Sequence, residues 1–342
     1  MNFQSQGTIK SDIPSIQECI QKFLENISLT RSENTFKTYR NGMNVFCEML
    51  AENEISPESS VLEITEEFTA KFAKYLKYYS SATENLYINV YKNFLEFLTA
   101  ENLIDINLFQ VKQLIGQRIR KPGIRLPQFP QEDIEKVISY ALELPSKLCE
   151  NEMDSLINLR DCAFLITLAD TGLRIHEACN LRRGDIDWFN KKAIIIGKGN
   201  KQAVIRFSER SILAMRRYLH TRGNLDGNSS RQLAVLPIFA RHDKGAGKNI
   251  LPITTKTGRM IVSQRVEECL GKEAVGTITP HSFRHYFVTC VLKKTGNLKI
   301  AQEFARHTNI AVTQRYTHLA NDELDSVYKK IFDVDNQESQ ET

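Results

Sequence analysis

The sequence predicts a mainly α-helical protein with one small β-sheet, organised as two domains. The chain has 342 residues, which is long enough for two domains that each bury a hydrophobic core. Apolar side chains recur at helical spacing along most of it, whereas β-branched residues alternate with others in a single stretch, 193–207. We expect four segments: an N-terminal helical bundle at 1–112, a basic linker at 113–128, an α+β domain at 129–332 and a disordered tail at 333–342.

The first hundred residues have the pattern of a helical bundle. Residues 11–27 place their apolar side chains on one stripe, and residues 32–50 begin with the capping residue Ser32 and continue with a second stripe. Two more amphipathic segments follow, at 64–79 and 83–102. The aromatic side chains recur at helical spacing, which favours a packed core over stacking on nucleobases: Tyr75, Tyr78, Tyr79, Tyr87, Tyr91, Phe94 and Phe97.

The linker at 113–128 differs from the segments on either side of it. Gly116, Pro122, Gly123 and Pro127 interrupt a continuous helix, and arginine and lysine residues add local positive charge. A basic linker suits the backbone of a nucleic-acid duplex, and an ordinary solvated linker has the same composition.

The second domain is expected to pack helices around one β-hairpin. Residues 193–207 predict two strands joined by a Gly-Lys-Gly-Asn turn that contains Lys198. A further short strand is expected at 235–239, between loops. The helices are expected at 130–142, 156–170, 173–181, 257–270, from 280 onward and at 321–332.

Charge is divided unevenly along the chain. Residues 1–110 carry 9 lysines and arginines against 15 aspartates and glutamates, whereas residues 111–342 carry 36 against 26. An excess of positive charge in the C-terminal two-thirds favours a polyanionic partner, although charge alone leaves DNA, RNA and a membrane surface open.

Export, membrane insertion and disulfides are not expected. The chain has no run of 18 apolar residues, and its start lacks a basic segment followed by an apolar run. The seven cysteines are widely spaced, odd in number and never form a C-x-x-C pair. They fit reduced core thiols in a cytoplasmic protein, and we expect Cys162, Cys179 and Cys290 to be packing residues.

Residues 279–318 contain several side chains suited to binding a phosphate. His281 and Arg284 are three residues apart on an expected helix, so they share a face. Thr279 is a good N-cap and Pro280 a good first helical residue, which would direct the free N–H groups of that helix toward the same anion. The guanidinium group of arginine binds two phosphate oxygens at once and stays protonated.

Tyr316 is the only plausible nucleophile in this stretch. A free phenol has a pKa near ~10, so it needs nearby positive charge and hydrogen-bond donors to attack at neutral pH. Taken singly, Tyr316 is also typical of half-buried packing, and Lys198 of a solvated turn. His281 and His285 could form a zinc pair, but the metalloprotease pattern requires glutamate where Ser282 stands.

Together these motifs resemble the tyrosine recombinases, also called the phage integrase family, of the simple two-domain type. The resemblance is carried by TGLRIHEACNL at 171–181, IIIGKGNKQ at 194–202, HSFRH at 281–285 and ARHTNIAVTQRYTH at 305–318. It covers 129–332 closely and implies the family's α+β catalytic domain there. The N-terminal bundle is similar in type to the family's SAM-like core-binding domain.

The resemblance implies a role for each matching residue. Arg174 and Arg284 would clamp the scissile phosphate, and His281 and His307 would complete the hydrogen-bonded cage around it. His281 would also exchange a proton with the nucleophile. Glu177 would support the site from behind.

The remaining two residues would carry the covalent chemistry. Lys198 would protonate the departing 5′-hydroxyl, and Tyr316 would become joined to DNA through a 3′-phosphotyrosine bond. Such a bond conserves the energy of the phosphodiester, so no cofactor and no metal are expected. The alternatives are a monomeric type IB topoisomerase and a catalytically silent DNA-binding protein.

The resemblance also implies the partners. Double-stranded DNA would be the substrate, and the apolar helix at 321–332 would insert into an adjacent subunit to form a homo-tetramer. An accessory DNA-bending protein or a partner recombinase would be a further partner, and both integration or excision of a mobile element and resolution of chromosome dimers remain open as the biological role.

One position departs from the family pattern. The family usually has glycine directly before the histidine that corresponds to His307, and this chain has Arg306 there. A side chain at this position would either crowd the phosphate or add a contact to it.

Overall fold

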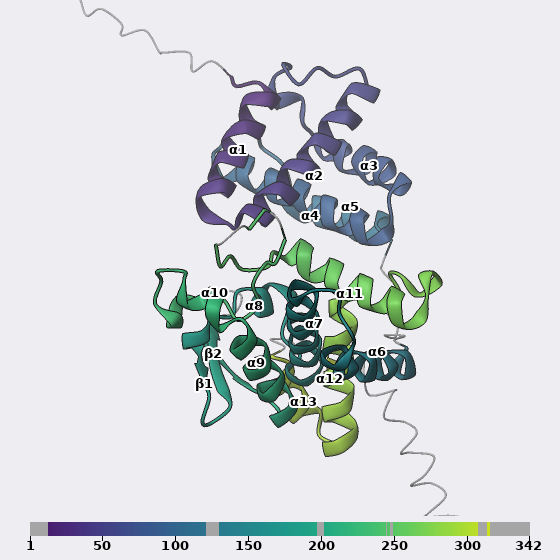
Figure 1. Ribbon diagram of the computed structural model, residues 1–342. Coiled ribbons are helices and arrows are strands. Elements are labelled where there is room, and N and C mark those ends of the chain that lie inside the picture. Colours follow the sequence, from purple (N-terminus) through teal and green to yellow (C-terminus); the bar gives the residue numbers. More distant parts are fainter. Residues whose placement is uncertain are drawn as a thin grey trace, which may run out of the picture. The chain divides into compact units, whose positions relative to one another are not determined.

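The computed structural model divides the chain into two compact units, Met1–Ile124 and Arg125–Thr342 (Figure 1). Both units are built mainly from helices, and the second contains one small sheet, which confirms the predicted fold class. Within the described ranges, none of the helices has the length and apolar character needed to cross a membrane. The structure describes residues 13–120, 130–196, 202–243, 245–246, 249–306 and 313–314.

The N-terminal unit is a helical bundle whose helices begin at polar capping residues. The Ser15 side chain accepts a hydrogen bond from the Glu18 amide at 3.2 Å, and the Glu18 carboxylate accepts one from the Ser15 amide at 2.8 Å. Ser32 caps the second helix, as the sequence predicted. The α-helices are α1 (Ile16–Thr30), α2 (Glu33–Glu52), α3 (Glu66–Tyr75), α4 (Ser81–Ala100) and α5 (Leu108–Arg118), with 3-10 turns η1 (Val61–Glu63) and η2 (Leu76–Tyr78).

Aromatic rings fill the core of this unit. The Phe46 ring lies 5.4 Å from Phe72, 5.0 Å from Tyr91 and 6.1 Å from Phe94, measured between centroids, and all four side chains are buried. The expected core role is therefore confirmed for Tyr91 and Phe94. The expected core role is wrong for Tyr78, whose side chain is 87% exposed at the end of the turn η2.

A buried carboxylate ties the start of the expected linker to this unit. The Glu84 side chain is 0% exposed and forms ion pairs with Lys77 and Arg120. It also accepts a hydrogen bond from the Arg120 amide at 3.0 Å. Helix α5 continues through Gly116 to Arg118, so the first part of the segment 113–128 is helical, and its later part lies outside the described residues.

The C-terminal unit is organised around the long helix α7, which is buried along most of its surface and packs against α6, α9 and α12 (Figure 1). Its residues are apolar on nearly every side, as expected of a helix at the centre of a core. The helices of this unit are α6 (Gln131–Glu143), α7 (Glu152–Thr171), α8 (Ile175–Cys179), α9 (Glu209–Thr221), α10 (Gly223–Gly227), α11 (Thr255–Leu270), α12 (Pro280–Thr295) and α13 (Leu298–Ala305).

One antiparallel sheet of order β1-β2-β3 accompanies these helices, with β1 at Ile186–Asp187, β2 at Lys192–Ile196 and β3 at Gln202–Arg206. Ala193 pairs with Ile205, which confirms the predicted hairpin. The turn that contains Lys198 lies outside the described residues.

The strand expected at 235–239 is not present. The 3-10 turn η5 (Leu233–Val235) overlaps its start, and an isolated bridge between Arg182 and Pro237 follows. Proline has no N–H to donate, so Pro237 cannot continue a ladder of strand hydrogen bonds. The buried Arg222 side chain instead donates to the carbonyl of Pro237 at 2.8 Å.

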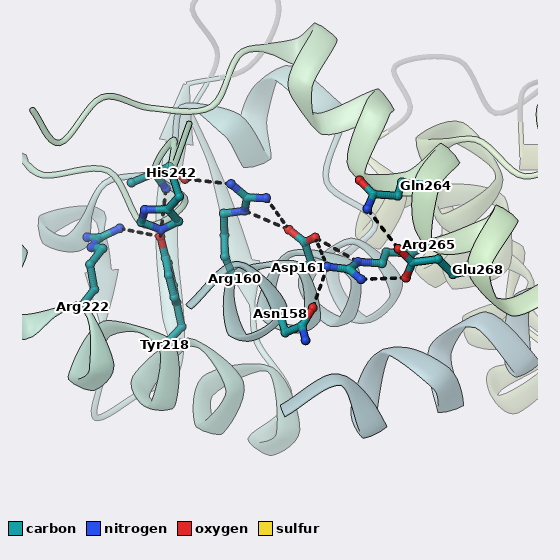
Figure 2. Close-up of polar contacts among 10 residues, drawn as sticks. Asn158, Arg160, Asp161, Tyr218, Arg222, His242, Gln264, Arg265 and Glu268 are labelled. Carbon is teal, nitrogen blue, oxygen red and sulfur yellow. Dashed lines mark hydrogen bonds and ion pairs between the residues drawn. The ribbon is translucent and has the colours of Figure 1, made fainter. Parts of the chain in front are cut away.

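A buried network around Asp161 fastens α7 to α11 (Figure 2). The Asp161 carboxylate accepts hydrogen bonds from Arg160 Nε at 2.8 Å and from Arg265 Nη2 at 2.8 Å. Arg265 also donates to Glu268 at 2.7 Å and to Asn158 at 2.8 Å. We call these five residues the Asp161 network, and each of its arginines contacts a carboxylate.

A neighbouring contact fixes the loop that follows α10. The Tyr218 hydroxyl and His242 Nε2 are 2.7 Å apart, and Arg222 Nη1 donates to the same hydroxyl at 3.1 Å (Figure 2). Burial, together with the Arg160 and Arg222 guanidinium groups, lowers the pKa of His242 to about 3. His242 is therefore a neutral hydrogen-bonding residue at physiological pH.

Candidate active site

The site begins where α7 ends, at Gly172. This residue has φ +58°, a left-handed conformation that ends α7 and that glycine adopts without strain. A Cβ atom at this position would lie 2.4 Å from Cδ1 of Phe287 on α12, so glycine also permits close packing of the two helices. The Gly172 carbonyl accepts hydrogen bonds from two arginines, Arg284 and Arg306.

Arg174 and Glu177 are three residues apart and meet at the start of α8, which spans Ile175–Cys179. The Glu177 carboxylate accepts a hydrogen bond from the Arg174 amide at 2.8 Å and one from Arg174 Nη1 at 3.1 Å. The Glu177 side chain is 2% exposed, whereas that of Arg174 is 37% exposed. The buried carboxylate thus binds one side of the Arg174 guanidinium group and leaves part of that group exposed to solvent.

Glu177 is held as a carboxylate by its cationic neighbours. Burial acts to raise its pKa, but the guanidinium groups of Arg306 and Arg174 and the hydrogen bond from the Arg174 amide outweigh burial, so the pKa of Glu177 is lowered. The side chain therefore supplies one negative charge at neutral pH beside the guanidinium groups of Arg174 and Arg306.

Helix α12 begins as the sequence predicted, with Thr279 as the N-cap and Pro280 as the first helical residue. The Thr279 amide donates to the Ser282 hydroxyl at 3.0 Å. Ser282 is thus a capping residue at the position where the metalloprotease pattern would require glutamate. His281 and Arg284, near the start of this helix, line the same pocket as Arg174.

Arg284 is the buried member of the pair. It is 3% exposed, and its guanidinium group donates to the carbonyls of Gly172 and Ala305. These contacts join the end of α7 and the end of α13 to the first turn of α12. The described part of the chain continues from Ala305 to Arg306, which therefore begins close to the Arg284 side chain.

His281 lies at the surface of the site and faces His285, with ring centroids 4.3 Å apart. Partial desolvation and the charges of Arg284 and Arg174 lower the pKa of His281. Burial, together with the His281 ring and the charge of Arg284, lowers the pKa of His285 to about 4. Both imidazoles are therefore neutral at pH 7, so His281 can accept a proton.

A pocket of about 500 Å³ opens between α8, α11 and α12. Arg174, His281 and Arg284 line it together with Arg259 and Ser263 of α11. Positive groups on three sides and a helix N-terminus suit it to an anion such as a phosphate. Sequence reasoning missed Arg259, because a single basic residue on an expected helix gives no signal of its own.

Arg306 ends α13 in a left-handed conformation, with φ 56° and ψ 42°. A non-glycine residue in this conformation is strained by roughly 1 kcal/mol, which explains why glycine suits the position. Its side chain is 13% exposed, and Nη2 lies 3.2 Å from Glu177 Oε2 and 3.2 Å from the Gly172 carbonyl. In the described part of the chain, Arg306 therefore contacts the supports of the site rather than standing in the open pocket.

Four of the expected site residues come together in the structure: Arg174, Glu177, His281 and Arg284. The other three, Lys198, His307 and Tyr316, lie outside the described residues, as does the expected helix at 321–332. We call the five residues that meet at the end of α7 the Gly172 cluster: Gly172, Arg174, Glu177, Arg284 and Arg306.

Comparison with models of protein families gives two matches, which cover different parts of the chain. The model described as Phage integrase family matches residues 140–323, more than half of the chain. The model described as Phage integrase, N-terminal SAM-like domain matches residues 20–102. Each match falls within one of the two compact units.

Curated relatives align over nearly the whole chain. The chain is 27% identical over 318 residues to tyrosine recombinase XerC of Bacillus subtilis (strain 168), covering 92% of this chain and 96% of that protein. It is 29% identical over 311 residues to the protein of the same name from Staphylococcus epidermidis, covering 90% and 95%.

Solved structures share the fold. The XerH site-specific recombinase bound to a palindromic difH substrate aligns with a TM-score of 0.66 and 18% identity, covering 92% of this chain and 84% of that one. The Tn1549 transposon integrase in complex with transposon right end DNA aligns with a TM-score of 0.62 and 18% identity, covering 93% and 99%.

Proposed function

This chain belongs to the phage integrase family and is a site-specific DNA recombinase of that family, and we propose that it cuts and rejoins DNA through a covalent bond to Tyr316. The observation that supports this proposal is the convergence of Arg174, His281 and Arg284 on one pocket, from segments far apart in the sequence. Two guanidinium groups and a neutral imidazole form a complementary site for a phosphodiester.

The cleavage step follows from the chemistry of these groups. The phenolic oxygen of Tyr316 attacks the scissile phosphorus, a new O–P bond forms, and the bond from phosphorus to the 5′-oxygen breaks. His281 accepts the phenolic proton, which its lowered pKa permits at neutral pH. Lys198 donates a proton to the departing 5′-oxygen, so charge does not accumulate on the leaving group.

The remaining groups stabilise the transition state. Arg174, Arg284 and His307 bind the non-bridging oxygens, where negative charge increases as phosphorus becomes pentacoordinate. Glu177 holds Arg174 in position through its two hydrogen bonds. Because the 3′-phosphotyrosine bond conserves the energy of the phosphodiester, attack by a new 5′-hydroxyl reseals the strand without a nucleotide cofactor.

Double-stranded DNA is the proposed substrate. Two of the solved structures that share the fold are recombinases described as bound to DNA, XerH with difH and the Tn1549 integrase with transposon DNA. We further propose that four subunits assemble on the DNA through residues 321–332, for which the sequence predicts a helix. We also propose that the protein acts in the cytoplasm, together with an accessory DNA-bending protein or a partner recombinase.

The first experiment maps DNA ends that are trapped covalently on the protein across the host genome. A nicked duplex built on the mapped site should then trap a covalent adduct with the wild-type protein, because the nick lets the released fragment diffuse away. The Tyr316→Phe variant should form none. An adduct that still forms with this variant would contradict the assignment of the nucleophile.

The same experiment separates the alternative functions and roles. Relaxation of plasmid DNA at random sites by a protein that stays monomeric would favour a type IB topoisomerase. Tight, specific binding without any adduct would favour a silent DNA-binding protein. Trapped ends at a single chromosomal locus would indicate dimer resolution, and ends at the borders of a mobile element would indicate integration or excision.

A further inference from the structure

Arg306 occupies a demanding position immediately before His307. Its backbone has the left-handed φ of 56°, where a side chain is strained and glycine is favoured. Its side chain nevertheless turns inward and is only 13% exposed. An arginine side chain that stayed on the surface would avoid the cost of desolvation.

The guanidinium group of Arg306 joins the supports of both phosphate-binding arginines. Nη2 lies 3.2 Å from Glu177 Oε2, and Glu177 holds Arg174 through two hydrogen bonds. The same nitrogen donates at 3.2 Å to the Gly172 carbonyl, which also accepts a hydrogen bond from Arg284. One side chain therefore connects the carboxylate that binds Arg174 with the carbonyl that binds Arg284.

These contacts do not form a well-satisfied ion pair of the kind that stabilises a fold. Nε and Nη1 of Arg306 are buried and have no hydrogen-bond partner among the described residues. Burial and the charge of Arg174 oppose the protonated form and lower the pKa of Arg306, although Glu177 acts in the other direction. Backbone strain and burial beside the like-charged Arg174 indicate a role in function rather than in stability.

We propose that Arg306 is a positioning residue for strand cleavage: by binding Glu177 and the Gly172 carbonyl together, it fixes Arg174 and Arg284 relative to each other. This inference rests on the proposed function, in which the two arginines bind the same phosphate. The sequence led us to expect that a side chain at position 306 would either crowd the phosphate or contact it. Arg306 instead acts through Glu177 and the Gly172 carbonyl, which bind the two arginines. A family member with glycine here lacks this connection.

The test compares Arg306→Gly with the wild-type protein on the nicked duplex described above. The rate of adduct formation under single-turnover conditions should fall roughly tenfold to a hundredfold, because small displacements of catalytic groups have effects of that size. The dissociation constant for the duplex should change by less than about threefold, and Tm should stay within about 4 °C or rise, because glycine removes the left-handed strain.

Lys191→Gly is the matched control. Lys191 is also a basic residue with positive φ, 53°, and it pairs with Glu209 at the surface, away from the Gly172 cluster. This variant should cleave at the wild-type rate. If Arg306→Gly also cleaves at the wild-type rate, or if it loses DNA binding or more than about 4 °C in Tm, the positioning role is wrong.

A double-mutant cycle tests whether Arg306 acts through Glu177. Glu177→Gln removes the charge that Arg306 binds while keeping the size of the side chain. In that background, Arg306→Gly should lower the cleavage rate by less than about threefold, because the connection is already broken. Two effects that simply multiply would show that Arg306 works independently of Glu177 and would overturn the inference.

The inference and the proposed function fail in different ways. A wild-type protein that forms no Tyr316-dependent adduct would reject the proposed function. A wild-type protein that forms this adduct, but at the same rate as Arg306→Gly, would reject only the role of Arg306.

Discussion

The Asp161 network and the Gly172 cluster are two buried arrangements of arginine and carboxylate in the same unit, and they differ in charge balance. The Asp161 network has two arginines and two carboxylates, Asp161 and Glu268, joined by hydrogen bonds of 2.7 to 3.0 Å (Figure 2). In the Gly172 cluster, three guanidinium groups accompany one carboxylate, Glu177.

From this difference in charge balance, we expect the Asp161 network to stabilise the fold and the Gly172 cluster to serve the active site. Buried charge that supports a fold is paired, because an uncompensated ion in a protein interior is strongly destabilising. Among the described residues, the Gly172 cluster places three guanidinium groups and one carboxylate beside a pocket, and one of its arginines, Arg174, is 37% exposed. We expect the exposed part of the Arg174 guanidinium group to bind the phosphate of DNA.

The largest expected effect is the loss of cleavage in Arg174→Ala. The rate of adduct formation should fall roughly a thousandfold, because one phosphate-binding cation disappears from the transition state. The free energy of unfolding should change little, since the side chain is partly exposed. Arg241→Ala is the matched control, because Arg241 also forms a local ion pair, with Asp243 at 2.7 Å, and should leave cleavage intact.

The converse effect is expected for Asp161→Asn in the paired network. The free energy of unfolding should fall by about 3–5 kcal/mol, because two buried arginines lose their shared counter-charge. Urea denaturation measures this loss, and Asp133→Asn at an exposed ion pair should leave the midpoint unchanged. A stable Asp161→Asn variant with impaired cleavage would remove the distinction between the two arrangements.

A smaller effect concerns pH and His242. Its pKa is lowered to about 3 in the folded protein, so the unfolded chain binds a proton near pH 6.5 and the folded one does not. Stability is therefore fully present above pH 6.5 and is lost as pH falls, by about 1–2 kcal/mol between pH 7 and pH 5. His242→Asn should flatten this dependence, whereas His220→Asn, at an exposed histidine, should not.

The smallest effect is expected for Arg259→Ala at the wall of the pocket. Arg259 is exposed, so we expect it to add a solvent-screened phosphate contact. The dissociation constant for the duplex should rise about threefold at low salt, and the difference should shrink as salt is added. An equal change in Arg231→Ala, which does not line the pocket, would indicate only a general effect of charge.

Several features followed from the sequence because they depend on neighbours along the chain. Ser32 and Thr279 begin helices through contacts within three residues, and Arg174 meets Glu177 within one turn. The hairpin at 193–207 followed from alternating side chains and a glycine-rich turn. In each case, local geometry alone determines which atoms meet.

Local signals were insufficient where one residue or a distant partner decided the outcome. The expected strand at 235–239 failed because Pro237 cannot donate and Arg222 takes its carbonyl. Helix α5 extends into the expected linker, and Arg120 beyond it is bound by Glu84, 36 residues away. Tyr78 follows the helical period of its neighbours but is exposed by the turn η2.

By itself, the sequence determined helices such as α2, α7 and α12, the hairpin and the residue types of the site, because caps, periodicity and spacing act over a few residues. It gave no prediction of α9, which spans Glu209–Thr221. Tertiary structure alone decided that Arg284 binds the Gly172 carbonyl, 112 residues away, and that Arg265 binds Asp161, 104 residues away. It also decided that Arg306 turns inward to Glu177. Such contacts depend on how α7, α11, α12 and α13 pack, and the whole buried core determines that packing.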